Sequence, residues 1–235
     1  WVANEMSPGT VVGNNIMTNP LSLEKVIEIA KKHNIYVLVD AAAQIYPLDI
    51  LGKYVRMGAD AQVVAAKYMG ASQSVGLALG TNEMIEKITK QSFTGYEGRR
   101  IRGIGRPMKV DRQEISGVTV AVHEWVTMNH EERLALAEKQ SSVMLAPLQN
   151  IKGVNAKIIN NIIGNQPFGV KVEIDENITG ISAEDLVEKL KSLNTPIWTR
   201  NGQNHEGNTI KLVPWALNPG EDKIVGASIA KLLQS

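Results

Sequence analysis

An acidic residue and a basic residue each follow a short apolar segment in the first third of the chain. Asp40 ends the segment 35–40, which reads IYVLVD, and Lys67 follows the segment 61–66, which reads AQVVAA. Continuous apolar runs of this kind are typical of strands in a parallel sheet that is covered on both faces. Because ligands of open α/β sheets bind outside the carboxyl ends of the strands, we expect both side chains to face one crevice.

An amine and a carboxylate in one crevice match the needs of pyridoxal 5′-phosphate. The aldehyde of this cofactor forms a Schiff base with a lysine, and its pyridine nitrogen pairs with an acid. Lys67 and Asp40 supply these groups, and the small residues at 41–43 and 65–66 leave room for a flat ligand. Each residue alone is also explained without a cofactor: Asp40 as the cap of a turn, and Lys67 as the first solvated residue after a strand. Together they favour a cofactor site.

Composition and charge limit the other classes of function. The chain has 235 residues, of which 43% are hydrophobic and 21% charged, as in a folded protein of one or two domains. The 25 Lys and Arg nearly balance the 24 Asp and Glu without a basic block, so a small-molecule substrate is expected rather than nucleic acid or a membrane. The absence of cysteine and the scattered histidines speak against a metal centre, and a cytoplasmic location is expected.

Helical and strand patterns alternate along the first half of the chain. Ser22 and Thr81 are expected to be N-caps of the helices that follow them. Helices are predicted over 23–33, 48–58 and 82–91, and a further strand over 74–80. This alternation predicts an α/β layer.

The rest of the chain divides into three parts. Residues 92–110 are rich in Gly and Arg and are predicted to form a functional loop. A long helical stretch is expected over 111–150, with a break near 129–130. Strand and helix patterns then alternate over 151–235, which predicts a smaller α+β unit.

Three segments resemble the fold-type-I pyridoxal phosphate enzymes. They are VDAAAQ at 39–44, GADAQVVAAKYMGASQSVGLALG at 58–80 and RGIGRPMKVDRQEISGVTVAVHEW at 102–125. The most similar branch contains L-seryl-tRNA(Sec) selenium transferase and D-glucosaminate-6-phosphate ammonia-lyase, and the resemblance runs from about residue 10 to the end. IGRPMKV, at 104–110, is its most specific part.

The resemblance implies a fold and an assembly. The fold is α/β, with residues 1–110 as the C-terminal portion of a pyridoxal-phosphate-binding large domain with a mostly parallel sheet. Residues 111–150 are a connecting long helix, and 151–235 a small α+β domain. The family is longer at its N-terminus, where its phosphate-binding turn lies, so we expect a fragment of a longer protein. A homodimer or higher homo-oligomer with the active site at a subunit interface is also implied.

The resemblance assigns roles to the residues around the cofactor. Lys67 matches the Schiff-base lysine, and Asp40 matches the acid under the pyridine nitrogen. Gln44 lies where a side-chain amide reaches the cofactor or the substrate, and a role as a turn residue is the equal alternative. At 64–66 the chain reads Val-Ala-Ala where family members carry Ser-Gly-Gly, whose hydroxyl helps to hold the cofactor phosphate.

Three further residues are expected to bind substrate. Gln73 falls in the segment after the lysine, where the family reads GPQ and this chain reads ASQ. Arg106 and Lys109 match the family's GRxxKV and are suited to a substrate carboxylate or phosphate. Their alternative role is that of a solvated loop.

The sequence predicts a pyridoxal-phosphate-dependent lyase or transferase. Lys67 would bind the cofactor, exchange it for the amine of an amino acid or amino-sugar acid, and take the α-proton, with β-elimination or replacement to follow. Selenium transfer to a tRNA is the first alternative, although no basic stripe is present to hold a tRNA. A truncated, non-catalytic relative that binds no cofactor is the second. An NAD-binding domain is not favoured, because no Gly-rich turn links a strand to a helix.

Overall fold

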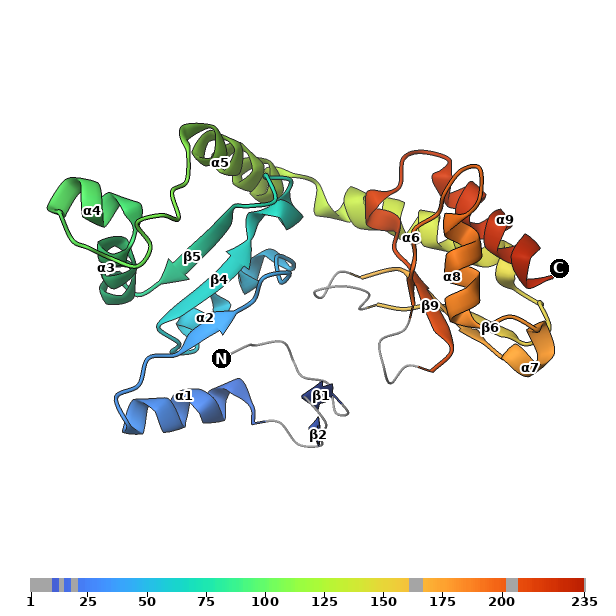
Figure 1. Ribbon diagram of the computed structural model, residues 1–235, viewed down its shortest axis with the longest axis horizontal. Helices are drawn as coiled ribbons and strands as arrows, with labels where there is room; N and C mark the ends of the chain where they lie inside the picture. Colours follow the sequence, from blue (N-terminus) through green and yellow to red (C-terminus); the bar gives the residue numbers. More distant parts are fainter. Residues whose placement is uncertain (1–9, 13–14, 18–20, 161–166, 202–206, 235) are drawn as a thin grey trace. The chain divides into compact units, whose positions relative to one another are not determined.

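The structure divides into two units with separate hydrophobic cores. Contacts between residues separate 1–128 from 129–235 (Figure 1), so each unit is described by itself. The structure is a computed structural model and describes residues 10–12, 15–17, 21–160, 167–201 and 207–234.

The first unit combines short strands with the helices that follow them. Its described elements are β1 (Thr10–Val12), β2 (Asn15–Met17), α1 (Leu23–Lys32), β3 (Leu38–Asp40), the 3-10 helix η1 (Leu48–Ile50), α2 (Lys53–Arg56), β4 (Ala61–Ala65), the 3-10 helix η2 (Ala66–Met69), β5 (Gly76–Gly80), α3 (Asn82–Gln91), α4 (Phe93–Arg99) and α5 (Arg112–Thr127). β1 and β2 form an antiparallel hairpin, and β3, β4 and β5 form a separate sheet.

Parallel pairing of β3 with β4 sets the architecture of the larger sheet. The strand order is β3-β4-β5, and residues 38–40 lie opposite residues 61–63. β5 runs antiparallel to β4, because residues 66–75 are too few for the crossover of about a dozen residues that a parallel pair requires. The predicted α/β class and the strands at 61–66 and 74–80 are confirmed, and the sheet is mixed in direction.

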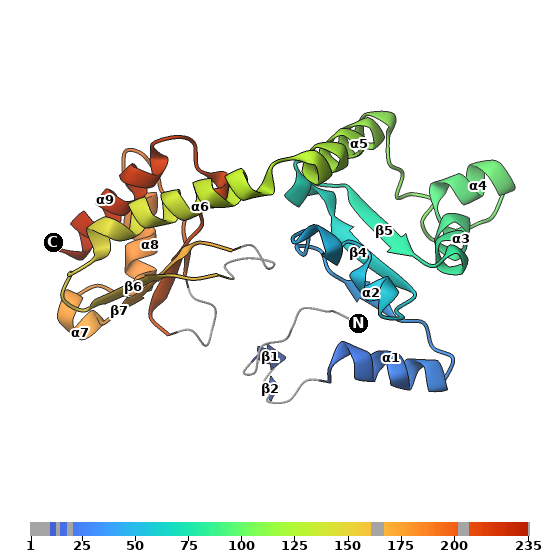
Figure 2. The ribbon, with the colours of Figure 1, turned by 180° about the vertical axis from the view of Figure 1, so that it is seen from behind.

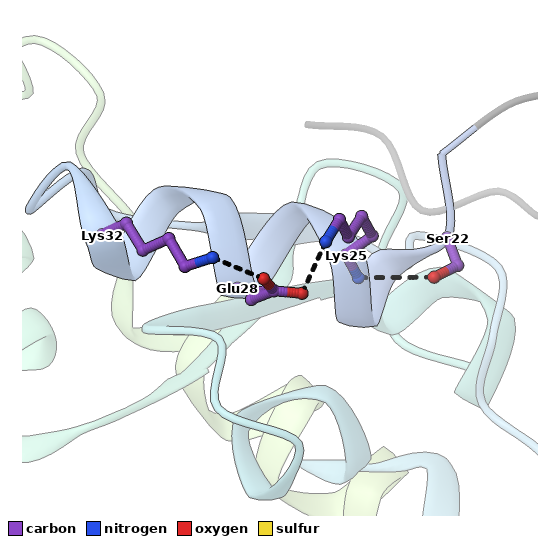
Figure 3. Close-up of polar contacts among 4 residues, drawn as sticks. All are labelled: Ser22, Lys25, Glu28 and Lys32. Carbon is purple, nitrogen blue, oxygen red and sulfur yellow. Dashed lines mark hydrogen bonds and ion pairs between the residues drawn. The ribbon is translucent and has the colours of Figure 1, made fainter.

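Helix α1 begins where its sequence predicts. Ser22 Oγ accepts a hydrogen bond from the Lys25 backbone N–H at 3.3 Å, which confirms the N-cap. Lys25 and Lys32 donate from Nζ to the two carboxylate oxygens of Glu28 at 2.8 and 2.7 Å (Figure 3). The bonds from Lys25 and then Lys32 lower the pKa of the Glu28 carboxyl. Their support for the helix is therefore present at neutral pH and is lost as the pH falls through that pKa.

The segment before Asp40 is less buried than its apolar sequence predicts. Val37 and Val39 lie in the core, but Tyr36 and Leu38 are 51% and 47% exposed. Among the described strands β3 is an edge strand, and alternate side chains of a strand point to opposite faces. In the described residues the face that carries Leu38 is open to solvent, so the expected cover on both faces of this strand is not seen there.

The second unit places helices over one face of an antiparallel sheet. Its described elements are α6 (His130–Leu145), the 3-10 helix η3 (Ala146–Leu148), β6 (Val154–Ile158), β7 (Val170–Ile174), α7 (Glu176–Thr179), α8 (Ala183–Lys191), β8 (Arg200–Asn201), β9 (Thr209–Leu212), the 3-10 helix η4 (Pro214–Ala216) and α9 (Glu221–Leu233). The strand order is β6-β7-β9-β8, and every described pair is antiparallel. Alternate residues of β7 are buried in a core shared with α6, α8 and α9, which lie together in Figure 2. The α+β character predicted for 151–235 is present, and the unit also includes residues 129–150, which the sequence assigned to a connecting helix.

The helical stretch predicted over 111–150 contains two helices, one in each unit. Asp111 and Glu114 close a capping box at the start of α5, and Asn129 Oδ1 accepts from the Glu132 backbone N–H at 3.2 Å to begin α6. The chain between the helices is extended at Met128. In the part of the chain that the structure describes, no helix is both long and apolar enough to cross a bilayer.

We predict that Gly226→Ala destabilises the protein although alanine is the better helix former. A Cβ at Gly226 in α9 would lie 2.9 Å from the Met144 carbonyl oxygen and 2.9 Å from Pro147 Cγ. Overpacking of this kind costs about 1–3 kcal/mol. Urea unfolding followed by circular dichroism measures the effect.

Gly117→Ala is the matched control within a helix. A Cβ at Gly117 in α5 meets no described atom within 4 Å, so this change should stabilise by about 0.5–1 kcal/mol. A Gly226→Ala variant as stable as the unaltered protein would show that α9 does not approach α6 this closely.

Candidate active site

Strand pairing brings Asp40 and Lys67 to one edge of the sheet. The Cα partner of Asp40 is Val63, and the hydrogen bonds continue beyond the strands, since the Ala65 N–H donates to the Ala42 carbonyl at 2.9 Å. Ala42 and Ala65 are thus the last residues that bond the two strands to each other. Asp40 lies two residues before Ala42, and Lys67 lies two residues after Ala65. The shared carboxyl-end edge expected from the sequence is what the structure shows.

Lys67 lies in η2 and is exposed. In the described residues its amine forms no ion pair or hydrogen bond, and its Nζ lies 5.3 Å from the centre of the Tyr68 ring. β4 ends at Ala65 and a 3-10 turn follows, which closes at Gly70 with a φ of 100°. Lys67 therefore lies just beyond the end of the buried strand.

Asp40 is exposed at the end of β3, and its carboxylate has one described partner. Its Oδ1 accepts from the backbone N–H of Ala42 at 3.0 Å, so the residue does cap its own turn, as the plain alternative predicts. No cation in the described residues pairs with it. The second oxygen, Oδ2, is therefore available to a ligand while the first holds the turn.

Gln44 lies in the interior of the first unit. It is 4% exposed, its backbone N–H donates to the Ala41 carbonyl at 2.8 Å, and its Oε1 accepts from the Tyr54 hydroxyl. This arrangement agrees with the turn role. Contact of the Gln44 side chain with a cofactor or substrate stays a prediction.

Gln73, Arg106 and Lys109 come from two separate loops. Gln73 is exposed in the turn between η2 and β5, and its side chain has no described partner. Arg106 Nη2 lies 3.3 Å from Glu97 Oε1, and its guanidinium lies 4.6 Å from the centre of the Tyr96 ring. Arg106 therefore packs against α4. In the described residues no hydrogen bond, ion pair or ring contact joins it to Asp40 or Lys67.

Phe93 completes a small group of cations and rings on α4. Lys109 Nζ lies 4.3 Å from the centre of its ring, and the Arg106 guanidinium lies 5.2 Å away. Cations at such distances are attracted to the ring face. Arg106 and Lys109 therefore share one aromatic platform, which agrees with a common role for the two residues.

Glycines allow the loop before Arg106 to approach the end of α3. The Gly105 N–H donates to the Gln91 carbonyl at 2.9 Å. A Cβ at Gly103 or at Gly105 would lie 2.6 Å from the Gln91 carbonyl oxygen, closer than atoms approach. The glycines of the RGIGR stretch thus serve to fix the path of the loop that carries Arg106.

Comparison with known proteins gives relatives of similar sequence. No protein-family model matches the chain. It is 27% identical over 204 residues to a 5′-C-glycyluridine monooxygenase-decarboxylase of Streptomyces sp., and 22% identical over 214 residues to the D-glucosaminate-6-phosphate ammonia lyase of Salmonella typhimurium. These matches cover 86% and 91% of this chain but 48% and 53% of the relatives. The chain thus spans about half the length of the curated relatives it matches.

Solved structures decide the fold. The structure of a D-glucosaminate-6-phosphate ammonia-lyase matches with a TM-score of 0.68 and 20% identity, over 100% of this chain and 56% of that one. Aminotransferases and a cysteine desulfurase match with TM-scores of 0.50 to 0.53. The chain has the fold of the fold-type-I pyridoxal phosphate enzymes.

The residues at the sheet edge fit the cofactor of fold-type-I enzymes in chemistry. The cofactor needs an amine for its aldehyde and a carboxylate for its ring nitrogen. Lys67 and Asp40 offer both from neighbouring strand ends, and neither is neutralised by an opposite charge in the described residues. Val64, Ala65 and Ala66 bring no hydroxyl to the phosphate, so another segment must hold it.

The sequence reasoning overlooked Tyr68 and the contacts of Tyr54. Tyr68 follows Lys67 directly, and this adjacency was the available signal for an aromatic ring beside the amine. Nothing in the sequence pairs Tyr54 with Gln44, because their contact depends on the path of the chain between them. Trp125 lies in the core of the first unit and is 6% exposed.

Removal of the Tyr54 hydroxyl tests the placement of Gln44. Tyr54→Phe takes a donor away from a buried oxygen, and we expect a loss of about 1–3 kcal/mol in the free energy of unfolding. Urea unfolding is the measurement. Tyr36→Phe is the matched control, because that hydroxyl bonds to Glu83 at the surface, and its effect should stay within about 0.5 kcal/mol. Equal small effects of both changes would contradict the buried position of the Gln44 amide.

Proposed function

We propose that this chain belongs to a pyridoxal-phosphate-dependent enzyme that acts on an amino acid or amino-sugar acid. Lys67 is the residue that binds the cofactor covalently, and Asp40 is the partner of its ring nitrogen. The observation that carries the proposal is the parallel pairing of β3 with β4, which sets an amine and a carboxylate at one sheet edge, the amine without an ion pair among the described residues. Clefts at such edges are where α/β proteins bind their ligands.

Each residue has a defined task in this reaction. When bound, the cofactor supplies an electrophilic aldehyde and a ring that spreads the electron pair left on the substrate α-carbon. Lys67 Nζ would hold the cofactor and, once freed, would receive the substrate α-proton as a general base. Asp40 would hold the proton on the ring nitrogen. The reaction class that these groups would serve is β-elimination or β-replacement.

The names of the relatives support the substrate class. Glucosaminate 6-phosphate is an amino-sugar acid, and 5′-C-glycyluridine carries a glycyl group on a nucleoside. We therefore favour an ammonia-lyase-like elimination on an amino-sugar acid over selenium transfer to a tRNA. The near balance of 25 basic and 24 acidic residues also gives little support for binding a tRNA.

Substrate binding and assembly belong to the same proposal. Arg106 and Lys109 would take a carboxylate or phosphate of the substrate, in which case the anion replaces Glu97 beside Arg106. Gln73 would contact the substrate from the turn that follows Lys67. A homodimer or larger homo-oligomer would supply groups that hold the cofactor phosphate.

Covalent capture of the cofactor tests the proposal. Incubation with pyridoxal 5′-phosphate and reduction with borohydride should fix the cofactor on Lys67, located by peptide mass spectrometry. Lys67→Ala should abolish this product. Lys53→Ala is the matched control, because Lys53 is likewise an exposed lysine followed by a tyrosine, and it should leave the product unchanged.

Two results would oppose the assignment. Label spread over several surface lysines would show that Lys67 is not selected by a site. A folded protein without any label would support the alternative, a relative that keeps the fold and binds no cofactor.

Asp40→Asn should weaken cofactor binding without unfolding the protein. Asparagine keeps the size of the side chain and its bond to the Ala42 N–H, but it removes the negative charge. A charge-assisted hydrogen bond is worth about 1.5–3 kcal/mol, so the dissociation constant should rise about tenfold to a hundredfold. A titration followed by absorbance measures it, with Asp49→Asn as an exposed control. Unchanged affinity would remove Asp40 from the site.

A further inference from the structure

Helix α5 contacts the loop that follows Asp40 and the loop that contains Lys67. The Asp40 loop is defined here as residues 41–47, and the Lys67 loop as residues 66–75. The 3-10 helix η2 of the Lys67 loop packs directly against α5. Side-chain hydrogen bonds then join each loop to a different end of this helix.

Trp125 joins the C-terminal end of α5 to the Asp40 loop. Its indole N–H donates to the backbone carbonyl of Ile45 at 2.9 Å. Trp125 and Ile45 are 6% and 2% exposed, so the bond satisfies a carbonyl that has little access to water. Because Ile45 follows Asp40 by five residues, this contact fixes the path of the chain as it leaves the site.

Glu114 joins the N-terminal end of α5 to the Lys67 loop. The Ser74 hydroxyl donates to Glu114 Oε1, and the Asp111 N–H donates to Oε2 at 3.1 Å. In return the Glu114 N–H donates to Asp111 Oδ1 at 2.7 Å, which closes the capping box. The carboxylate that caps the helix is therefore the group that holds Ser74.

The two contacts lie on one side of a rigid element. Glu114 and Trp125 are eleven residues apart, which is close to three turns, so they share a face about 16 Å apart along the axis. Ala121, between them on the same face, is 5% exposed. An α-helix that is capped and packed along this face sets a fixed distance between its two contacts.

We propose that α5 is a brace that sets the position of the Asp40 loop relative to the Lys67 loop, with Trp125 and Glu114 as positioning residues. A catalytic role of α5 rests on the proposed function, since it assumes that Asp40 and Lys67 act on one cofactor. The coupling of the two loops is inferred from the hydrogen bonds alone. Neither residue touches the reacting atoms.

Hydrogen–deuterium exchange of the protein without cofactor tests the coupling. Trp125→Phe keeps an aromatic side chain and removes the bond to Ile45. Ser74→Ala removes the bond to Glu114 at an exposed position and leaves the bonds between Asp111 and Glu114 intact. We expect each variant to speed exchange about tenfold in both loops, as loss of a hydrogen bond worth about 1.4 kcal/mol would do.

Two matched control variants distinguish coupling of the two loops through α5 from a general increase in exchange. Trp215→Phe removes an indole N–H that has no hydrogen-bond partner in the described residues, and Ser72→Ala removes an exposed hydroxyl from the Lys67 loop itself. Both should leave exchange unchanged. Faster exchange only in the loop next to each substitution, no change in either loop, or the same change in the controls would overturn the proposal.

Cofactor binding supplies the readout that connects the brace to function. The absorbance of the bound cofactor changes with pH, and the midpoint of this change should move by about half a pH unit or more in Trp125→Phe and in Ser74→Ala. Borohydride should still fix the cofactor on Lys67 in both variants. An unmoved pH profile would overturn the positioning role. Failure of the unaltered protein to take the cofactor would count against the proposed function and would leave the exchange result to decide the brace.

Discussion

The parallel pairing of β3 with β4 is the constraint on which the other features of the site depend. Parallel strands leave a sheet in the same direction, so the residues that follow them share an edge. Asp40 and Lys67 are 27 positions apart in the sequence, and they become neighbours in the fold because residues 38–40 lie opposite residues 61–63. A slip of one residue in this register would turn every side chain of one strand to the opposite face.

Asp40 ends a strand of the sheet, whereas Lys67 lies in the 3-10 turn that follows the neighbouring strand. Local contacts fix both segments: Gly70 closes the turn after Lys67, and Asp40 Oδ1 holds the turn that follows β3. Arg106 lies on another such loop, which glycines seat against α3. The fold-type-I architecture thus separates a rigid support from the segments that meet a ligand.

Much of the fold is predictable from local patterns, because caps and periodicity are local. Ser22 and Thr81 cap their helices as expected, and the strand before Lys67 appears where the apolar run predicts it. The direction of β5 and the exposure of Leu38 were not predicted from the sequence, because they depend on connection length and on which elements cover a face. Gln44 shows the same limit, since its buried contact with Tyr54 comes from the course of the chain between them.

For the site, the pair Asp40 and Lys67 was accessible to sequence reasoning, whereas its supports were not. A charged residue at the end of an apolar run is a visible signal, but the bond from Trp125 to Ile45 joins residues 80 apart and leaves no pattern. The platform that Phe93 and Tyr96 form under Arg106 is also a product of the fold.

The roles of Lys67 and Asp40 are best tested by a crystal structure of the protein with pyridoxal 5′-phosphate. We expect continuous electron density from Lys67 Nζ to the aldehyde carbon of the cofactor. We also expect an oxygen of Asp40 at about 2.7–3.2 Å from the ring nitrogen. Density for the cofactor on another lysine, or a ring nitrogen that faces away from Asp40, would contradict these roles.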